Sequence, residues 1–272
     1  MTATAPLLAD ETWFDRTTSV HRRSPGTYAV ELDTSWSSLT GIHGGSMVAM
    51  AVRAAQDHEP GRPVRTVATS FLRPGQPGPA ELRIEPVRRG RSLTTLSVVL
   101  EQGDRPVLTS RMTLVEARPG ESWEKLEASG VAPVEASIPL DPPAEAGLVP
   151  HFDHATALLD PAHVPFSRSA DARVGGHVRP LEPRPIDAAW LAMILDWFPP
   201  SPFTRLDPPT GGVSIDLTVH LHRTRAVLGD DEWLEGRFRA DVSHGGLALE
   251  HGRIADADGT LLAESFHTRW TG

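Results

Sequence analysis

The sequence predicts an α+β fold in which each half of the chain wraps a curved antiparallel sheet around one apolar helix. Two observations support this prediction. Each half contains one helix-length segment that is apolar on nearly all sides, over 46–56 and 188–198, and four strand-like runs follow each segment. A helix that is apolar all round must be buried, and a meander of strands can cover it.

Strands and a buried helix are expected in order along the first half. Thr27–Asp33 alternates apolar and polar residues, as a half-buried strand does, and Ser46–Gln56 is the apolar helix. Gly90 and the pair Gly103-Asp104 lie where hairpin turns belong. The four strand-like runs after the helix are Arg65–Leu72, Ala80–Arg88, Ser92–Gln102 and Pro106–Ala117.

The second half repeats this order. His177–Leu181 has the pattern of a strand, Asp187 is a good N-cap for a helix over Ala188–Phe198, and the two prolines that follow stop this helix. Asp258-Gly259 is a strong signal for a two-residue hairpin turn. The strand-like runs are Val213–Arg223, Trp233–Val242, Leu247–Ala255 and Leu261–Trp270.

A proline-rich segment separates the two halves. Five prolines between Arg118 and Leu148 resist regular structure, which predicts a linker over the surface, and the pattern also allows a short helix at Glu121–Ala128. We therefore expect an N-terminal domain over residues 1–118, a linker over 119–147 and a C-terminal domain over 148–272.

The two halves align with each other. The helix segments match when Val48 is laid on Leu191, an offset of 143 positions. The next strands match at an offset of 150, and Ser110 matches Ser265 at an offset of 155. Because the offset grows only between elements, we interpret the pattern as an internal duplication. A lone apolar helix followed by a meander, present twice, predicts a tandem (double) hotdog fold.

Composition limits the function classes. The chain of 272 residues is 39% hydrophobic and 22% charged, as expected for a soluble globular protein. No run of about 18 apolar residues could span a membrane, and Met1–Asp10 does not resemble a signal peptide. We therefore expect a cytoplasmic protein without a membrane partner. The absence of cysteine excludes disulfides, zinc–thiolate sites and cysteine nucleophiles.

The net charge of -9, without a block of lysines or arginines, argues against nucleic acid as a partner. An anionic ligand would need a local group of arginines.

Several motifs resemble the acyl-CoA thioesterase II (TesB-like) family. They are the Gly44-Gly45 helix start, Phe71-Leu72-Arg73-Pro74-Gly75, Arg88-Arg89-Gly90-Arg91-Ser92, and Ser214-Ile215-Asp216 with His222-Arg223. The resemblance covers both halves and omits the linker. It implies a double hotdog, acyl-CoA substrates, no cofactor, and a homodimer or higher homo-oligomer.

The resemblance also implies a catalytic site. In this family an Asp, a Thr or Ser, and a Gln of the second hotdog orient the attacking water. Carried over by position, these are Asp196, Ser214 and His267, so the last residue departs from the family pattern. Histidine can donate and accept hydrogen bonds as glutamine does, and it can also take a proton.

Asp196 follows an apolar run and precedes Trp197-Phe198, so we expect burial to raise its pKa and make it a better base. The alternative is an aspartate turned to solvent at the end of a helix. Without the family, the favoured interpretation of Ser214 is an ordinary residue at a strand edge. His267 could equally lie on the solvent face of an edge strand. The first-half counterparts of the three residues are Arg53, Val64 and Met112, which cannot activate water, so one site is expected.

Candidate substrate-binding residues are His43, Gly44, Gly45 and Arg91. Amides at the start of the helix could bind an oxyanion or a phosphate, or the glycines could only allow close packing. Arg91 and its neighbours could contact CoA phosphates or form a solvated hairpin edge. His220 and His222 lie at metal-ligand spacing on one strand face, but no third ligand is evident, and we expect no metal.

Acyl-CoA thioester hydrolysis is the function expected from these residues. One alternative is a non-catalytic acyl-CoA-binding or scaffold protein. The other is an enoyl-thioester hydratase, which would have an Asp-x-Asn-x-x-His stretch where this chain has Asp33–Ser38. An α/β-hydrolase is excluded because no Gly-x-Ser-x-Gly motif is present.

Overall fold

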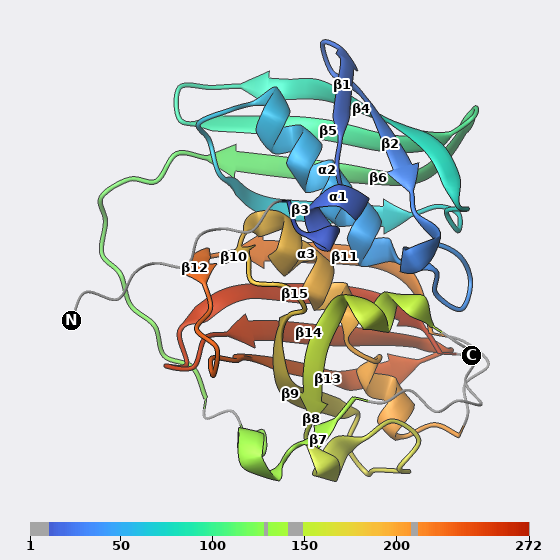
Figure 1. The fold of residues 1–272 in the computed structure, drawn as a ribbon, viewed down its shortest axis with the longest axis vertical. Helices are drawn as coiled ribbons and strands as arrows, with labels where there is room; N and C mark the ends of the chain where they lie inside the picture. The colour runs from blue at the N-terminus through green and yellow to red at the C-terminus, as the bar shows by residue number, and fades with distance from the viewer. Residues whose placement is uncertain (1–10, 128–129, 141–148, 208–211, 272) are drawn as a thin grey trace.

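The computed structural model describes residues 11–127, 130–140, 149–207 and 212–271. Thirteen described strands form one sheet in the order β1-β2-β4-β5-β6-β3-β11-β15-β14-β13-β9-β8-β7. Figure 1 shows the first half of the chain (blue to green) above the second (yellow to red), with α2 in front of the strands of the first half and α3 near the boundary between the halves. The predicted α+β double-hotdog fold is confirmed.

Each half has the same arrangement of five strands and one helix. The first comprises β2 (Thr27–Leu32), α2 (Gly44–His58), β3 (Val64–Phe71), β4 (Gly78–Arg89), β5 (Leu93–Gln102) and β6 (Arg105–Val115). The second comprises β9 (Arg173–Pro180), α3 (Ala188–Trp197), β11 (Val213–Leu221), β13 (Leu234–His244), β14 (Leu247–Ala255) and β15 (Leu261–Trp270). In each half the helix joins the outermost of these strands to the one at the centre of the molecule.

Short elements surround this double framework. The strands are β1 (His21–Ser24), β7 (Ile138–Pro139) and β8 (Ala155–Leu159) at the ends of the large sheet, and β10 (Pro185–Ile186) with β12 (Arg225–Val227) in a small one. The helical elements are α1 (Trp13–Thr17), η1 (Thr34–Trp36), η2 (Val134–Ala136), η4 (Pro150–His154), η5 (Pro161–His163) and η6 (Ser201–Thr204).

The two hotdogs share one continuous sheet because β3 and β11 pair in antiparallel register, with Val67 opposite Val219. The pairing leaves neither strand with an open edge, which would invite aggregation. The pairing brings the start of β11 beside the end of β3, at the boundary between the halves.

The strand registers support the internal duplication. Val67 lies opposite Met112 in the first half, and Leu217 lies opposite His267 in the second. These pairs are related by the offsets of 150 and 155 found in the sequence. A register irregularity also follows Val64 in the first half and Ser214 in the second. The first-half counterparts of Ser214 and His267 are therefore Val64 and Met112, as predicted.

The two central helices pack closely against each other at one end. A Cβ atom at Gly45 would lie 2.6 Å from the carbonyl oxygen of Met193 and 3.1 Å from Cβ of Asp196. A larger residue would push the N-terminus of α2 away from the last turn of α3. This contact brings the N-terminus of α2 onto Asp196, the one acidic residue of α3.

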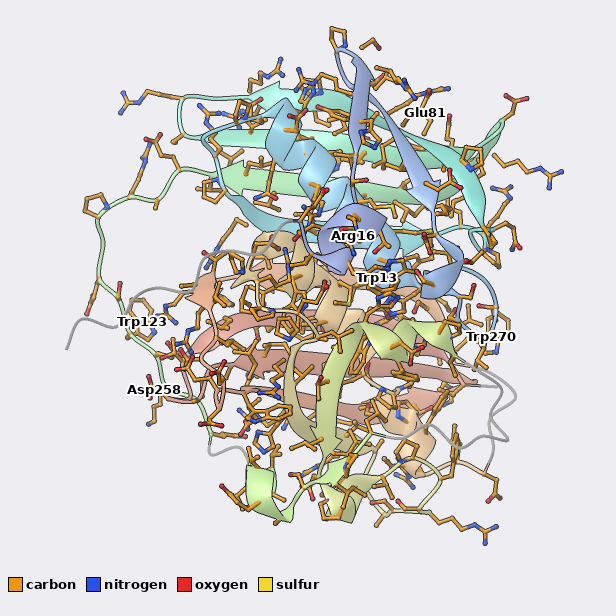
Figure 2. The ribbon with its side chains drawn as sticks, viewed as in Figure 1. Trp13, Arg16, Glu81, Trp123, Asp258 and Trp270 are labelled. Atoms are coloured by element: carbon orange, nitrogen blue, oxygen red, sulfur yellow. The ribbon has the colours of Figure 1, made fainter. Side chains whose placement is uncertain are left out.

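The predicted helix at Glu121–Ala128 is wrong for the residues that the structure describes, because 121–127 are not helical and Ala128 lies outside them. Side-chain contacts hold this segment extended instead: Glu124 accepts a hydrogen bond from the Leu261 N–H at 2.5 Å and pairs with Arg223 at 2.7 Å. Trp123 points outward and is 81% exposed (Figure 2), so the segment lacks the buried apolar face that stabilises a short helix.

Candidate active site

Asp196 lies in the last turn of α3 and is 7% exposed. Its Oδ2 accepts a hydrogen bond of 2.7 Å from the Gly45 N–H at the start of α2. The carboxylate therefore occupies the positive end of the α2 dipole, which stabilises its charge. The apolar helix ends directly after it, because Pro199 and Pro200 follow the C-cap residue Phe198.

His43 also holds Asp196 in place. As the N-cap of α2, its Nδ1 accepts a hydrogen bond from the Ser46 N–H at 3.3 Å. Nε2 of the neutral ring must then carry the proton, and it lies 3.1 Å from the Asp196 carbonyl oxygen and 3.5 Å from Oδ2. The sequence predicted that His43 and Gly45 contact the substrate. In the structure both residues contact Asp196.

The other carboxylate oxygen faces three side chains from β11 and β15. Oδ1 of Asp196 lies 3.4 Å from Ser214 Oγ, 3.5 Å from His267 Nδ1 and 3.6 Å from Arg269 Nη1. The structure thus brings the three predicted catalytic residues together around one oxygen. The distances are longer than the hydrogen bonds such groups form directly.

His267 is fully buried, and neither of its ring nitrogens has a hydrogen-bond partner among the described residues. A buried polar atom without a partner is costly unless water or a ligand satisfies it. Of the two nitrogens, Nδ1 is the one that lies near Asp196, 3.5 Å from Oδ1.

The sequence interpretation missed Arg269 and Glu250. Nε of Arg269 donates to Oε1 of Glu250 at 2.7 Å, and Oε2 of Glu250 accepts from the Ser201 N–H at 2.5 Å. Both side chains are buried, so Arg269 forms a charged bridge between Glu250 and Asp196. Strand alternation could have indicated Arg269, because residues 267 and 269 of β15 face the same side.

The expected rise in the pKa of Asp196 is wrong. Burial acts to raise this pKa, but the neighbouring imidazoles of His43 and His267 act against it. The Arg269 guanidinium and the Gly45 N–H add to their effect, and the pKa ends below its ordinary value of 3.8. Asp196 is therefore ionised at neutral pH.

The histidines around this carboxylate are neutral near pH 7. Burial lowers the pKa of His267 to about 4, with the Arg269 charge as the second cause, and burial also lowers the pKa of His43. Burial likewise lowers the pKa of His151, whose ring stacks on His43 with centroids 4.7 Å apart. Arg269 therefore supplies the fixed positive charge beside Asp196.

These buried imidazoles predict acid sensitivity. The pKa values of His154 and His267 lie at about 4, below the ordinary 6.5, so the unfolded chain binds more protons than the folded chain between these values. Stability consequently rises with pH across this window and is lost as pH falls from 6.5 toward 4. We expect urea denaturation to show a loss of about 1 kcal/mol or more between pH 7 and pH 5.

His154→Gln should reduce this pH dependence, whereas the exposed His21→Gln should leave it unchanged. Equal urea midpoints at the two pH values in the wild type would contradict this account of the buried imidazoles.

Comparisons with known proteins agree with the fold. The acyl-CoA thioesterase N-terminal domain matches residues 32–115, and the acyl-CoA thioesterase C-terminal domain matches residues 133–270. The chain belongs to the acyl-CoA thioesterase family. This family membership assigns it to the thioester hydrolases and agrees with the predicted resemblance.

Two solved structures illustrate the shared fold. A conserved protein of unknown function with a hot dog fold from Alicyclobacillus acidocaldarius has a TM-score of 0.84 and 21% identity, covering 95% of this chain and 97% of that one. An acyl-CoA thioesterase II from Mycobacterium marinum has a TM-score of 0.73 and 21% identity, covering 96% and 97%. At this identity the similarity shows the fold alone.

A curated relative is closer in sequence over a shorter stretch. An uncharacterized protein of Mycobacterium tuberculosis (strain ATCC 25618 / H37Rv) is 32% identical over 133 residues, which cover 44% of this chain and 45% of that protein. The match therefore spans about half the length of this relative.

In this member of the acyl-CoA thioesterase family, the predicted substrate contact Arg91 lies away from Asp196. Its carbonyl oxygen accepts from Arg62 Nη2 at 2.9 Å, and the neighbouring Arg89 pairs with Glu59, directly after α2 ends. Asp196 contacts the opposite, N-terminal end of this 15-residue helix. The geometry within one chain does not bring Arg91 to the site.

The described residues of this family member include no group of three or more that could hold a metal ion. His222 instead pairs with Glu264 at 3.3 Å, and Glu264 also pairs with His251 at 3.1 Å. In the described part of the chain, no helix is long and apolar enough to cross a membrane.

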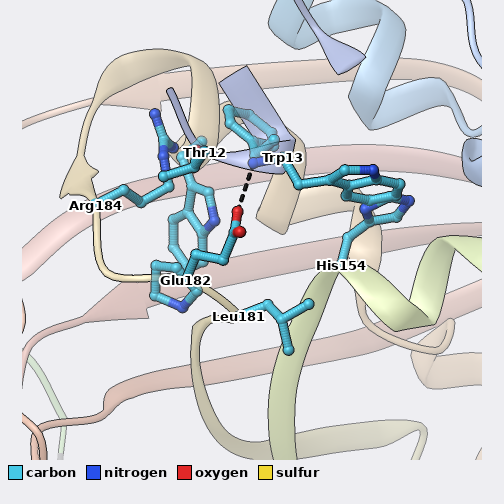
Figure 3. Close-up of a pocket in the computed structure, with 9 residues that line it drawn as sticks. Thr12, Trp13, His154, Leu181, Glu182 and Arg184 are labelled. Atoms are coloured by element: carbon cyan, nitrogen blue, oxygen red, sulfur yellow. Dashed lines mark hydrogen bonds between the residues drawn. The ribbon is translucent and has the colours of Figure 1, made fainter. Parts of the chain in front are cut away.

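An ion cluster surrounds Arg53, the predicted first-half counterpart of Asp196. Asp15 of α1 pairs with Arg53 at 2.5 Å and with Arg184 at 2.9 Å. The Phe14 ring lies under both guanidinium groups, at 5.2 and 4.3 Å. Figure 3 shows Arg184 beside Glu182, which accepts a hydrogen bond from the Trp13 N–H. In this acyl-CoA thioesterase family member, α1 thus covers the first-half position.

Proposed function

We propose that the chain hydrolyses acyl-CoA to the free acid and CoA by direct attack of a water molecule held beside Asp196. The observation that supports this most strongly is the convergence of Ser214 Oγ and His267 Nδ1 within 3.5 Å of Asp196 Oδ1. The opposite oxygen is fixed by the Gly45 N–H, so the carboxylate cannot turn away. A water between these groups would be oriented by all three.

The water oxygen attacks the thioester carbonyl carbon while its proton passes to Asp196 Oδ1 or to the neutral His267. The tetrahedral intermediate then collapses, the carbon–sulfur bond breaks, and the proton returns to the CoA sulfur. A thioester carbonyl is already a good electrophile, so a positioned water and a modest base suffice. This step requires no covalent nucleophile.

The Gly44 N–H is the proposed donor to the oxyanion of the intermediate. It is the first amide of α2, and within the described residues it has no hydrogen-bond acceptor, whereas the amides of Gly45 and Ser46 are occupied. A Cβ at Gly44 would lie 2.8 Å from Asp196 Oδ2 and 2.8 Å from the Phe71 ring. Glycine thus leaves the amide beside the water open to the thioester oxygen.

His267→Gln restores the residue found in the family and should keep kcat within about tenfold of the wild type, because an amide can still orient the water. Ser214→Ala should lower kcat by about two- to tenfold, since it removes one hydrogen bond. Steady-state kinetics at pH 7 measure both effects. A loss of more than about 10²-fold in His267→Gln would show that the imidazole itself takes the proton.

Product analysis separates the proposed reaction from its alternatives. Mass spectrometry after incubation with a saturated and an enoyl-CoA should find free acid and CoA from the saturated substrate. A hydrated thioester from the enoyl substrate would indicate a hydratase. Unchanged substrate that nevertheless binds would indicate an acyl-CoA-binding protein.

We also expect a homodimer or larger assembly. Six large apolar side chains are more than 40% exposed on the four strands around the active-site half, among them Trp270 (Figure 2). They are Val213, Val242, Leu247, Leu249, Phe266 and Trp270. Such a patch favours contact with a second copy. Sedimentation at micromolar concentration should give a species larger than 29.4 kDa, and Leu249→Glu should shift it toward monomer. A wild-type monomer would contradict this.

A further inference from the structure

A basic groove lies on the second half of the large sheet, on the face that points away from α3. Its volume is about 170 Å³. One wall is formed by β9, β13 and β14, and the other by three residues of the segment that joins the two halves: Glu127, Gly130 and Val131. The groove exists because Gly175 has no side chain: a Cβ there would lie 2.9 Å from the Val131 side chain. The segment that joins the two halves can therefore pack onto β9 and leave an open space beside it.

Arginines from three neighbouring strands line this groove. Arg173 of β9 lies opposite Arg239 of β13, which lies opposite His251 of β14. In the next row, Arg237 lies opposite Arg253. Side chains at directly opposite positions on one sheet face lie about 5 Å apart, so the four guanidinium groups share one small surface. In a chain with a net charge of -9, this is a local concentration of positive charge.

The acidic residues nearby neutralise this charge only in part. Arg173 has no ion pair among the described residues, and Asp241, the partner of Arg239, is 66% exposed to solvent. Glu264 is shared by His222, His251 and Arg253. Nε of Arg253 is buried without a hydrogen-bond acceptor, and such a donor is costly unless a ligand or water satisfies it.

The lining carboxylates do not fill the groove either. Asp160 is buried, and its two oxygens accept from the N–H groups of Ala162 at 2.9 Å and Ala132 at 3.3 Å. Its charge is thus directed at the backbone. Glu127 is the second carboxylate of the lining, against four arginines.

The groove is separate from the proposed active site. Along β14, the buried Glu250 faces the Arg269–Asp196 cluster, and the adjacent His251 faces the groove, because successive side chains of a strand point to opposite faces. The sheet itself therefore lies between the two sites of one chain. A ligand in the groove would not contact the reacting thioester of the same chain.

We propose that this groove binds a phosphate-bearing small molecule through its diphosphate or phosphomonoester oxygens. Arginine suits this chemistry because its planar guanidinium donates two parallel hydrogen bonds to phosphate oxygens. The volume of about 170 Å³ admits more than a single ion, and guanidinium groups from three strands border this space. The nucleotide end of CoA and a free diphosphate share this chemistry, and only the first of these ligands rests on the proposed function.

Calorimetric titration of the full chain at low salt tests the proposal with two probes, inorganic pyrophosphate and adenosine 3′,5′-bisphosphate. Saturable binding of at least one probe is expected. Arg173→Glu should weaken it by about tenfold or more, since this exposed arginine has no described partner whose loss could disturb the fold. Arg23→Glu makes the same charge change on β1, an exposed strand of the first half, and should alter binding by less than about twofold.

Preferential binding of the bisphosphate would assign the groove to the nucleotide end of a CoA-type ligand, and preferential binding of pyrophosphate to a free diphosphate. The absence of saturable binding at millimolar probe would overturn the proposal. Equal weakening in Arg173→Glu and Arg23→Glu would also overturn it, because it would show general attraction to the surface. Binding is measured without turnover, so this result is independent of the hydrolysis assay.

Discussion

Replacing Asp196 with asparagine is expected to lower kcat by on the order of 10²–10⁴ while the protein stays folded. Asparagine has nearly the same shape and can still accept the Gly45 N–H bond that holds Oδ2 at 2.7 Å. It cannot take a proton from water, and it removes the charge that faces Arg269 at 3.6 Å. The effect should therefore appear in the chemical step.

Asp153→Asn is the matched control, because this exposed aspartate of η4 lies on the surface and has no described partner. Its kcat should equal that of the wild type. Circular dichroism and urea denaturation of both variants verify the fold. If Asp196→Asn kept full turnover, the hydrolase assignment at this site would be abandoned in favour of acyl-CoA binding alone.

Gly45→Ala should impair both stability and catalysis. The added methyl group would lie 2.6 Å from the Met193 carbonyl oxygen and 2.7 Å from the His43 ring, closer than packed atoms allow. Since α2 must move away from α3, the Gly45 N–H bond to Asp196 lengthens. We expect a loss of about 1–3 kcal/mol in the free energy of unfolding and a drop in kcat of about 10²-fold.

Gly120→Ala provides the comparison for this substitution, because a Cβ at Gly120 would meet nothing within 4 Å. It should change neither the urea midpoint nor kcat. A Gly45→Ala protein with wild-type stability and turnover would show that the contact between the two helices does not position Asp196.

The framework of the fold was predictable because the periodicity of a buried helix and that of a strand are both visible in a short stretch of sequence. The two apolar helices and the ten strands that surround them follow from periodicity, and the registers of β3 with β6 and of β11 with β15 agree with the sequence offsets. The short strands β1 and β7 escaped prediction because they contain few residues and no alternation: β1 is the exposed sequence His21–Ser24. Their pairing depends on neighbouring strands and leaves little trace in their own residues.

The site was predictable in its residues but not in its electrostatics. Asp196 stands out as the one acidic residue in an apolar helix, and the family pattern points to Ser214 and His267. The pKa of Asp196 is lowered despite its burial chiefly by His43 and His267, and Arg269 and the Gly45 N–H add to their effect. All four residues are distant from Asp196 in sequence. A buried arginine in a strand is rare without a partner, and its partner Glu250 lies on another strand.

The release of free thiol from saturated acyl-CoA by the purified wild-type chain tests the central claim most directly. The account predicts repeated, saturable turnover for at least one acyl chain length, with one CoA and one free acid formed per cycle. The same assay with Asp196→Asn should give a rate lower by on the order of 10²–10⁴. Release no faster than spontaneous hydrolysis across a range of chain lengths, or equal rates from the two proteins, would contradict it.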